Sequence, residues 1–82
     1  MHDLKITPKY YDAVYNGAKT FEVRKADRPY RVGDTLWLRE YDPEKPKYTN
    51  RRLKAVITYI LTAEDFPEAI APEYIIIGMR LL

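Results

Sequence analysis

Residues 7–25 read T-P-K-Y-Y-D-A-V-Y-N-G-A-K-T-F-E-V-R-K, a pattern that predicts a short helix leading directly into a strand. Thr7-Pro8 supplies an N-cap followed by a proline at the first helical position. Apolar side chains then recur at three- and four-residue spacing, at Tyr11, Val14 and Tyr15. Gly17 stands where a left-handed residue is expected to end the helix, which therefore spans roughly two turns.

Three charges of mixed sign lie in the second half of this stretch. Successive side chains of a strand point to opposite faces, so Glu22 and Arg24 share one face while Phe21 and Val23 take the other. We expect the two apolar side chains to face the core and the two charged ones to be displayed. Lys19 sits at the bend before the strand and can reach either side. The stretch therefore predicts a carboxylate and two cations held together on a rigid strand.

Elsewhere in the chain, the alternation of apolar and polar residues predicts four further strands. Together with the one above, they cover Leu4–Ile6, Thr20–Lys25, Thr35–Tyr41, Arg52–Leu61 and Glu73–Leu82. On the long fourth strand the alternation assigns one face to Leu53, Ala55, Ile57, Tyr59 and Leu61. The last strand has isoleucines on both faces, which is typical of a strand buried on both sides. Gly78 within it indicates a bulge or a close backbone approach.

Turn-forming residues separate these strands. Val32-Gly33-Asp34 is a turn signal, and Asp42–Asn50, with two prolines and four charges, predicts a protruding loop. The segment 62–72 predicts a loop with one helical turn at Ala63–Phe66. Five strands and one main helix, placed after the first strand, predict a small α+β barrel, because closing the sheet removes exposed strand edges.

The composition bounds the class of protein. The 82 residues make one expected domain, 1–82, and the absence of cysteine excludes disulfides and thiolate metal sites. The longest apolar run, Tyr74–Ile77, is far shorter than the ~20 residues that span a bilayer, and the N-terminus lacks the apolar stretch of a signal peptide. We therefore expect a cytoplasmic protein.

His2, the one histidine, has no second histidine to complete a metal site, so we expect neither metal nor cofactor. The oligomeric state is left open.

Basic residues are unevenly distributed, although the net charge is only +2. One group spans Arg24–Arg31 and another spans Lys45–Lys54, with interleaved rings at Tyr30, Tyr41 and Tyr48. Cations combined with aromatic rings suit single-stranded nucleic acid or nucleotides. The alternative is that a chain with 32% charged residues simply has charged loops. Trp37 and Arg39 share a strand face and are expected to stack as a cation–π pair, with ligand stacking by Trp37 as the alternative.

The motif G-x-K-x-x-E-x-R at Gly17–Arg24 resembles the signature of the ASCH (activating-signal-cointegrator homology) superfamily. Further segments are similar to one small bacterial and phage branch: V-G-D-T-L at Val32–Leu36, L-R-E-Y-D-P at Leu38–Pro43, Y-T-N-R-R at Tyr48–Arg52 and the closing Y-I-I-I-G. The resemblance covers nearly the whole chain. It implies a PUA-like β-barrel that binds RNA or nucleotides in a cleft beside the motif.

Some small ASCH proteins are amidohydrolases that deacylate acetylated cytidine with a lysine, a threonine and a glutamate. Lys19 stands at the place of the lysine, and Glu22 stands at the place of the threonine. The glutamate of those hydrolases comes from a later insertion. In the corresponding region this chain has three carboxylates: Glu64, Asp65 and Glu68. A neighbouring carboxylate favours the charged form of a lysine, so the trio suits holding a ligand better than activating Lys19. A second hypothesis is that the chain is an amidohydrolase in which Lys19 and Glu22 are catalytic. A third is that it is a structural or protein-interaction module.

RNA or a nucleotide-like molecule is thus the expected partner, in a cleft lined by Lys19, Glu22 and Arg24. Three further residues are expected to contact it: Glu40 as a second carboxylate from the neighbouring strand, Tyr48 as a stacking ring, and Arg52 as a contact to a nucleic-acid backbone. Arg28 and Arg51 would extend that contact.

Overall fold

The computed structural model describes all 82 residues. Its elements, in chain order, are β1 (His2–Ile6), α1 (Pro8–Tyr15), β2 (Phe21–Lys25), β3 (Thr35–Asp42), β4 (Lys47–Thr62) and β5 (Tyr74–Leu81). The strands form one sheet in the order β1-β3-β4-β5-β2, in which β1 and β3 are parallel and the other neighbours antiparallel. Five strands with a helix after the first are therefore confirmed. The helix has eight residues, and nothing helical in the chain has the length and apolar character to cross a membrane.

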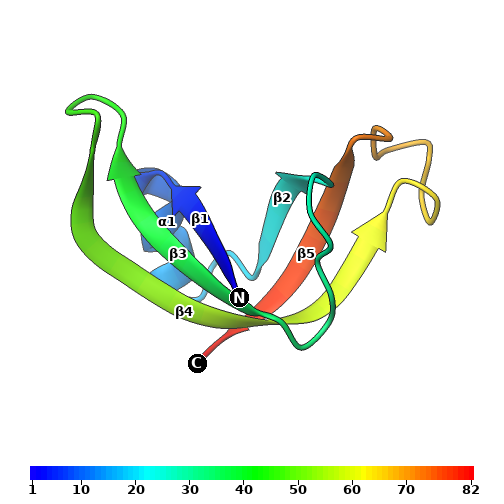
Figure 1. Cartoon of the computed structure of the whole chain (residues 1–82), viewed down its shortest axis with the longest axis horizontal. Helices are drawn as coiled ribbons and strands as arrows, with labels where there is room; N and C mark the ends of the chain where they lie inside the picture. The colour runs from blue at the N-terminus through cyan, green and yellow to red at the C-terminus, as the bar shows by residue number, and fades with distance from the viewer.

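The sheet curls into a half-barrel and does not close fully. Figure 1 shows β4 running along the base of the curve, with β1 and β3 rising on one side and β2 and β5 on the other. β1 and β2 are the two edge strands, and no backbone ladder joins them. We call the opening between them the seam. The small α+β barrel predicted from the sequence is thus present as a half-barrel that is open at the seam.

One apolar cluster lies on the inner side of the curved sheet, the side that α1 covers. Its largest fully buried side chains come from the three central strands and α1: Leu36, Leu38, Ile57, Ile77 and Val14. Tyr11 joins them from α1 and is 4% exposed. Tyr15 does not belong to this stripe as the sequence predicted, since it is 67% exposed. Its ring stacks on that of Tyr11, with ring centroids 6.5 Å apart, and is otherwise exposed near the end of the helix.

α1 begins and ends where the sequence places it. Pro8 occupies the first turn and Thr7 the N-cap position, although the Thr7 hydroxyl makes no capping hydrogen bond. Gly17 adopts a φ of +84°, and its N–H donates to the Val14 carbonyl at 3.1 Å. That left-handed conformation suits a residue without a Cβ, so the predicted helix end is confirmed.

β4 changes its inner face partway along its length. Ile57 and Tyr59 pair with consecutive residues of β5, so Thr58 is the extra residue of a bulge. Beyond it the alternation is inverted: Tyr59 is 65% exposed, whereas Ile60 packs against the core. The apolar face predicted for Tyr59 is therefore wrong. Gly78 pairs with Tyr59 beside this bulge, so the irregularity expected at this glycine is confirmed as a bulge in the partner strand. A Cβ at Gly78 would lie 3.4 Å from Thr58 Oγ1, which is ordinary contact.

The segment 42–50 is largely strand and not a protruding loop. β4 begins at Lys47, which leaves only a short turn between it and β3. Tyr48 pairs with Tyr41 across this hairpin, and their rings meet edge to face with centroids 5.2 Å apart. This aromatic cross-strand pair stabilises the extended strands. The register then shifts, and Asn50 in β4 adopts a φ of 75°.

Candidate functional site

β2 presents its two faces opposite to the sequence prediction. Phe21 and Val23, expected to face the core, are 45% and 53% exposed, whereas Glu22 is only 5% exposed. The strand register gives the cause: Glu22 lies beside the buried Ile77 of β5 and points to the inner side of the sheet. A carboxylate is stable in such a place only when cations accompany it. Glu22 and Arg24 of β2 therefore lie on the inner side of the sheet at the seam, whereas Lys25 is exposed.

Glu22 is held between two cations. Lys19 Nζ donates to Glu22 Oε1 at 2.5 Å and to the backbone oxygen of Phe21 at 2.8 Å. Arg24 Nε donates to Glu22 Oε2 at 3.1 Å, and Arg24 Nη2 lies 3.0 Å from the same oxygen. The side chains of Lys19 and Arg24 keep 16% and 23% of their surface exposed, against 6% for Glu22. The structure thus brings the three motif residues together with an excess of one positive charge.

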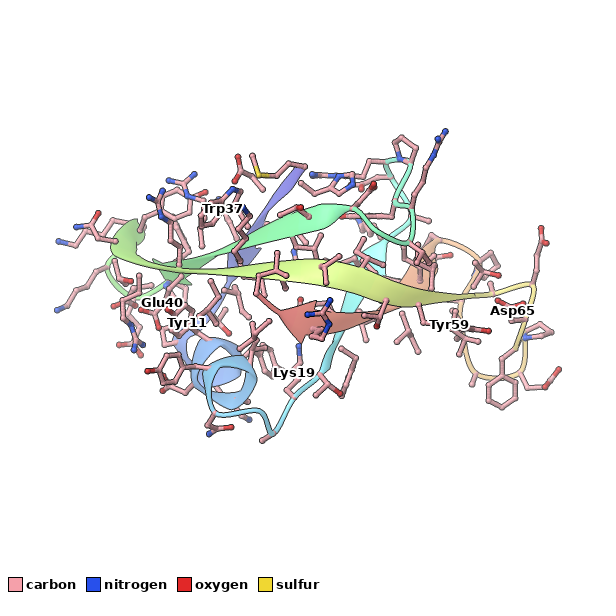
Figure 2. The ribbon with its side chains drawn as sticks, turned by 90° about the horizontal axis from the view of Figure 1, so that it is seen from below. Tyr11, Lys19, Trp37, Glu40, Tyr59 and Asp65 are labelled. Atoms are coloured by element: carbon pink, nitrogen blue, oxygen red, sulfur yellow. The ribbon has the colours of Figure 1, made fainter.

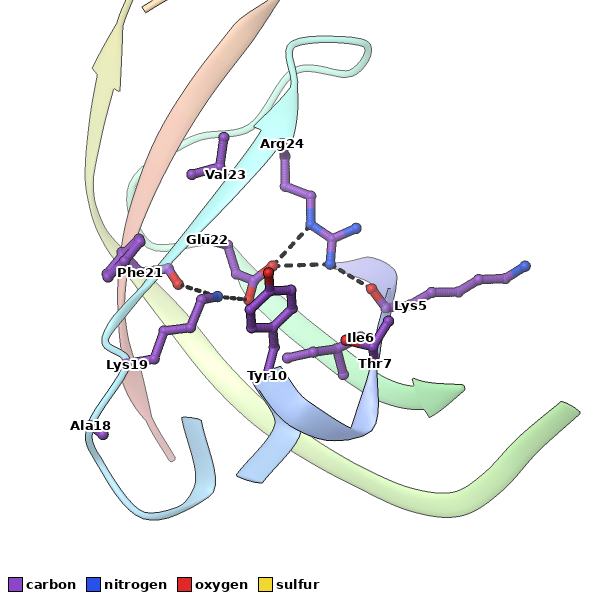
Figure 3. A pocket seen from close by; sticks show the side chains of 10 residues that line it. All are labelled: Lys5, Ile6, Thr7, Tyr10, Ala18, Lys19, Phe21, Glu22, Val23 and Arg24. Carbon is purple, nitrogen blue, oxygen red and sulfur yellow. Dashed lines mark hydrogen bonds and ion pairs between the residues drawn. The ribbon is translucent and has the colours of Figure 1, made fainter. Parts of the chain in front are cut away.

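Arg24 also connects the two edge strands. Its Nη2 donates a 2.6 Å hydrogen bond to the backbone oxygen of Lys5 in β1. Figure 3 shows the guanidinium reaching from β2 across the seam to this carbonyl, with the Glu22 carboxylate beside it. Because no backbone ladder joins β1 and β2, this side chain supplies a polar link between them.

A cavity of about 710 Å³ opens beside the trio. Its lining, drawn in Figure 3, comes from the end of β1, α1, the turn before β2, and β2: Lys5, Ile6, Thr7, Tyr10, Ala18, Lys19, Phe21, Glu22, Val23 and Arg24. Lys19 Nζ lies 5.2 Å from the ring centres of both Tyr10 and Phe21. The volume is in the range of small-molecule sites. We call it the seam cavity.

Sequence reasoning missed Lys5, Thr7 and Tyr10 as lining residues. For Tyr10 a signal was available, since Tyr11 faces the core and the preceding residue of a helix must then point about 100° away. Lys5 contributes its backbone carbonyl to the cavity wall, while its side chain points away from the cavity (Figure 3). The parallel pairing of β1 with β3 is non-local, so no local pattern reveals this position.

Glu40 belongs to a second buried cluster and does not line the seam cavity. Two strands separate β3 from β2, so Glu40 is not on the neighbouring strand, as the sequence had suggested. Its side chain accepts hydrogen bonds from Thr49 Oγ1 at 2.6 Å and from Arg51 Nε and Nη2 at 2.9 and 2.6 Å. The hydrogen bond from Arg51, followed by that from Thr49, holds the pKa of Glu40 below its ordinary value despite burial. Arg51 also contacts Asp12 of α1 at 3.2 Å, so this cluster joins the hairpin to the helix.

Tyr48 and Arg52 lie on the outer face of the sheet, which points away from α1, and neither lines the seam cavity. The structure therefore does not bring them together with Lys19. The cation–π pairs also differ from expectation. Arg39 stacks on Tyr48 with its guanidinium carbon 4.0 Å from the ring centre, while Arg52 lies 4.9 Å from that of Trp37.

The three carboxylates in the region of the hydrolase glutamate do not line the seam cavity either. Asp65 accepts hydrogen bonds from the backbone N–H and the hydroxyl of Thr62, at 2.9 and 3.1 Å, and so closes the turn after β4. Glu64 and Glu68 are exposed in the same connection. Figure 2 shows Asp65 beyond the end of β4, away from Lys19.

His2 has a structural place, as expected. Its Nε2 lies 2.8 Å from Asp34 Oδ2 and its ring lies against Tyr30, with centroids 4.6 Å apart. The hydrogen bond with His2 is the main reason why the pKa of Asp34 is below its ordinary value. Arg28 stands 5.7 Å from the Tyr30 ring and 3.8 Å from Asp27, outside the seam cavity.

Fold and cavity together define a class of protein: a small α+β half-barrel with a buried carboxylate between two cations at its open seam. The chain belongs to the family described as "Domain of unknown function (DUF3850)", whose model matches residues 1–79. It is also similar to the "Uncharacterized 12.9 kDa protein in GpA 3'region" of Escherichia phage P2, with 40% identity over 68 residues. That match covers 83% of this chain and 61% of the phage protein, so the chain spans less than two thirds of this relative.

Proposed function

We propose that the chain binds RNA or a nucleotide-like ligand in the seam cavity, with Lys19, Glu22 and Arg24 as the recognition residues. One observation carries the proposal: a buried carboxylate holds two partly exposed cations at the wall of a cavity of about 710 Å³. Ordinary surface ion pairs do not require a buried partner. The pairing with Glu22 fixes the direction of both cations before any ligand arrives.

Both cations keep hydrogen-bond donors for a ligand. An ammonium has three donors, and Lys19 uses two of them, to Glu22 and to the Phe21 carbonyl. The bonds of Arg24 come from Nε and Nη2, so the two N–H groups of Nη1 have no acceptor in the protein. Donors of this kind and one excess positive charge suit a phosphate or the acceptor edge of a base.

The rest of the cavity suits a planar ring. Tyr10 and Phe21 are 49% and 45% exposed, and both contribute to the lining. Aromatic faces stack on nucleobases with little dependence on sequence, and Ile6 and Val23 complete the apolar wall. The expected occupant is a mononucleotide, or a single nucleotide of an RNA strand.

The same geometry favours binding over hydrolysis. Lys19 already donates to a carboxylate, and an ammonium has no lone pair with which to attack or to accept a proton. Glu22 is the one carboxylate in the lining, and it is occupied by both cations. The amidohydrolase alternative, in which Lys19 activates the attack and Glu22 handles protons, has less support.

We further propose that the half-barrel is PUA-like and that the chain is a small member of the ASCH superfamily. The setting of the motif supports this: G-x-K-x-x-E-x-R runs from the end of α1 into β2, and its three charged side chains line one cavity. A cytoplasmic location stays a prediction from the sequence.

Calorimetric titration of purified protein with each of the common nucleoside 5′-monophosphates, at low salt, tests the cavity. We expect binding that weakens at least about tenfold in Arg24→Ala and in Lys19→Ala, since each removes a charge-assisted hydrogen bond. Lys9→Ala removes an exposed cation of α1 outside the cavity and should leave binding unchanged.

Two results would overturn the proposal: no binding of any mononucleotide or short RNA at low salt, or intact binding in Arg24→Ala. A parallel incubation with acetylated cytidine tests the amidohydrolase alternative. Deacetylation by the wild-type chain that disappears in Lys19→Ala would replace the binding proposal with the amidohydrolase.

A further inference from the structure

We infer that the outer face of β1, β3 and β4 is a second site, which binds single-stranded nucleic acid. This face lies opposite the apolar cluster: Figure 2 shows Trp37 on one side of β3 and β4, and Tyr11 with α1 on the other. The inference goes beyond the seam cavity and does not rest on it, because the cations and rings that carry it lie outside that cavity and the ligand is longer. Arg24, at the seam, borders both sites.

Three cations stand abreast on this face. Lys5 of β1 pairs with Arg39 of β3, and Arg39 pairs with Arg52 of β4, so the three side chains leave adjacent strands at one level. We call them the cation row; it spans about 10 Å, given the usual strand spacing. Like charges directly opposite on a sheet are destabilising, and no carboxylate forms a salt bridge with any of the three. A bound polyanion would remove this repulsion.

Aromatic rings flank the cation row on both sides along the strands. The pair Tyr41 and Tyr48 lies on the side toward the hairpin, and Trp37, two residues before Arg39 in β3, lies on the other side. Each ring has a cation on its face: Arg39 at 4.0 Å from Tyr48, Lys5 at 4.4 Å from Tyr41, and Arg52 at 4.9 Å from Trp37. A guanidinium stacked in this way keeps its edge for a phosphate and its second face for a base.

Two hollows of about 320 Å³ each lie along the cation row, and Arg39 and Tyr48 line both of them. We call the two together the groove. One extends toward Arg52, and the other extends toward Arg24 and Arg28 at the seam. The groove therefore has a cationic lining along its length, and it crosses three strands.

The alternation of cations with rings selects a single strand over other anions. A duplex offers its phosphates but keeps its bases stacked inside, and an acidic peptide would use the cations but not the rings. A single strand supplies phosphates and unstacked bases together. Among the residues that β1, β3 and β4 place around the cation row on the outer face, Asp3 is the one carboxylate, and it pairs with Trp37. The face is therefore strongly positive. RNA and single-stranded DNA share this chemistry.

Fluorescence anisotropy with labelled oligo-U, oligo-dT and a duplex of equal length tests the inference. Arg39→Gln/Arg52→Gln removes two charges of the row and keeps polar side chains in place. Lys9→Gln/Arg31→Gln removes two exposed cations outside the grooves and cavity, and serves as the control. We expect wild-type and control proteins to bind the single strands, and the row variant to bind at least about tenfold more weakly.

Two further readouts separate the site from a general loss of structure. With three phosphate contacts, the slope of log K against log salt should be about −2, falling to about −0.7 in the row variant. The row variant should melt no lower than wild type, because the repulsion between Arg39 and Arg52 is gone. Trp37→Leu should weaken binding of single strands while the salt slope stays unchanged, since it removes stacking only.

The inference is overturned if the wild-type chain binds no oligonucleotide at low salt, or if the row variant binds like wild type. It is equally overturned if the duplex binds as tightly as the single strands, or if polyglutamate competes fully while Trp37→Leu changes nothing. Equal affinity for oligo-U and oligo-dT supports contact through phosphates and bases alone, and tighter RNA binding supports the same surface with an added 2′-hydroxyl contact. Lys19→Ala should keep oligonucleotide binding, so this site and the seam cavity fail independently.

Discussion

Arg24 and Lys5 are joined by a 2.6 Å hydrogen bond from the Arg24 guanidinium to the Lys5 backbone oxygen, which links the edge strands β2 and β1. The same guanidinium pairs with the buried Glu22. A side chain proposed to bind the ligand therefore also holds the wall of its own cavity. Changes at Arg24 should affect both binding and stability, and the two effects can be measured separately.

Replacing Arg24 with lysine should lower the thermal midpoint while the charge is kept. An ammonium is a point charge without the planar fork that reaches Glu22 and Lys5 at once. Loss of one hydrogen bond costs about 1 kcal/mol, which corresponds to ~4–8 °C in a domain of this size. Circular dichroism melting measures it, with Arg80→Lys at an exposed position of β5 as the control. An unchanged midpoint for Arg24→Lys would mean that the link across the seam adds no stability.

Glu22→Ala should destabilise the fold although it removes a buried charge. The change leaves the Lys19 and Arg24 cations without their shared partner, at a cost of about 2 kcal/mol given their partial exposure. Urea unfolding compares it with Glu44→Ala in the hairpin turn, which should stay within about 0.5 kcal/mol of wild type.

A triple alanine variant at Lys19, Glu22 and Arg24 tests the hypothesis that the chain is a structural or protein-interaction module. Strong destabilisation without any ligand for the wild-type chain would favour a purely structural motif.

Glu40 should make the fold sensitive to acid. Hydrogen bonds from Arg51 and Thr49 hold its pKa below the ordinary value of 4.5, so the native state binds this proton less readily than the unfolded chain. Its contribution to stability is complete above that value and is lost as the pH falls through the lower folded pKa. Glu40→Gln cannot ionise and should flatten this part of the profile. Urea unfolding at successive pH values measures the slope, and parallel profiles for the two proteins would assign the acid response to other carboxylates.

Asn50 should tolerate glycine but not alanine. Its φ of 75° lies in the left-handed region, where a Cβ without a compensating polar side chain costs about 1 kcal/mol or more. Asn50→Ala should therefore lose about 1 kcal/mol of unfolding free energy, while Asn50→Gly stays close to wild type. Chemical denaturation measures both variants. Equal loss in the two would show that the asparagine side chain matters, and the backbone angle does not.

The sequence predicts those parts of the fold whose signals are local. The helix is recognisable because Pro8 starts it and Gly17 ends it within one short segment. The faces of β2 cannot be recognised from the sequence, because hydrophobicity alone predicts that Phe21 and Val23 point to the core. Only pairing with β5, far along the chain, turns Glu22 to the inner side. The bulge that exposes Tyr59 is likewise defined by the register between β4 and β5, which the alternation along β4 alone does not reveal.

The candidate site divides in the same way. Its motif residues were found because they lie within eight positions of one another around a helix end and a strand start. Glu40 was assigned to the wrong neighbour, since the strand order β1-β3-β4-β5-β2 is a property of the whole sheet. The cation row could not be predicted either, because it depends on the pairing of Lys5 with Arg39. Parallel strands are not joined by a short turn, so the sequence holds no local signal for this pairing.

The two walls of the seam pair only with strands that are remote in the sequence, β1 with β3 and β2 with β5, whereas β3, β4 and β5 follow one another as consecutive hairpins. Since closing long loops costs entropy before the contacts form, this three-stranded meander should assemble early and the segment 1–25 should dock late. Leu4, Ile6, Tyr11 and Val14 anchor this segment in the core, and its local opening would expose the proposed binding cavity. An occupant of that cavity should therefore slow hydrogen exchange in the segment 1–25.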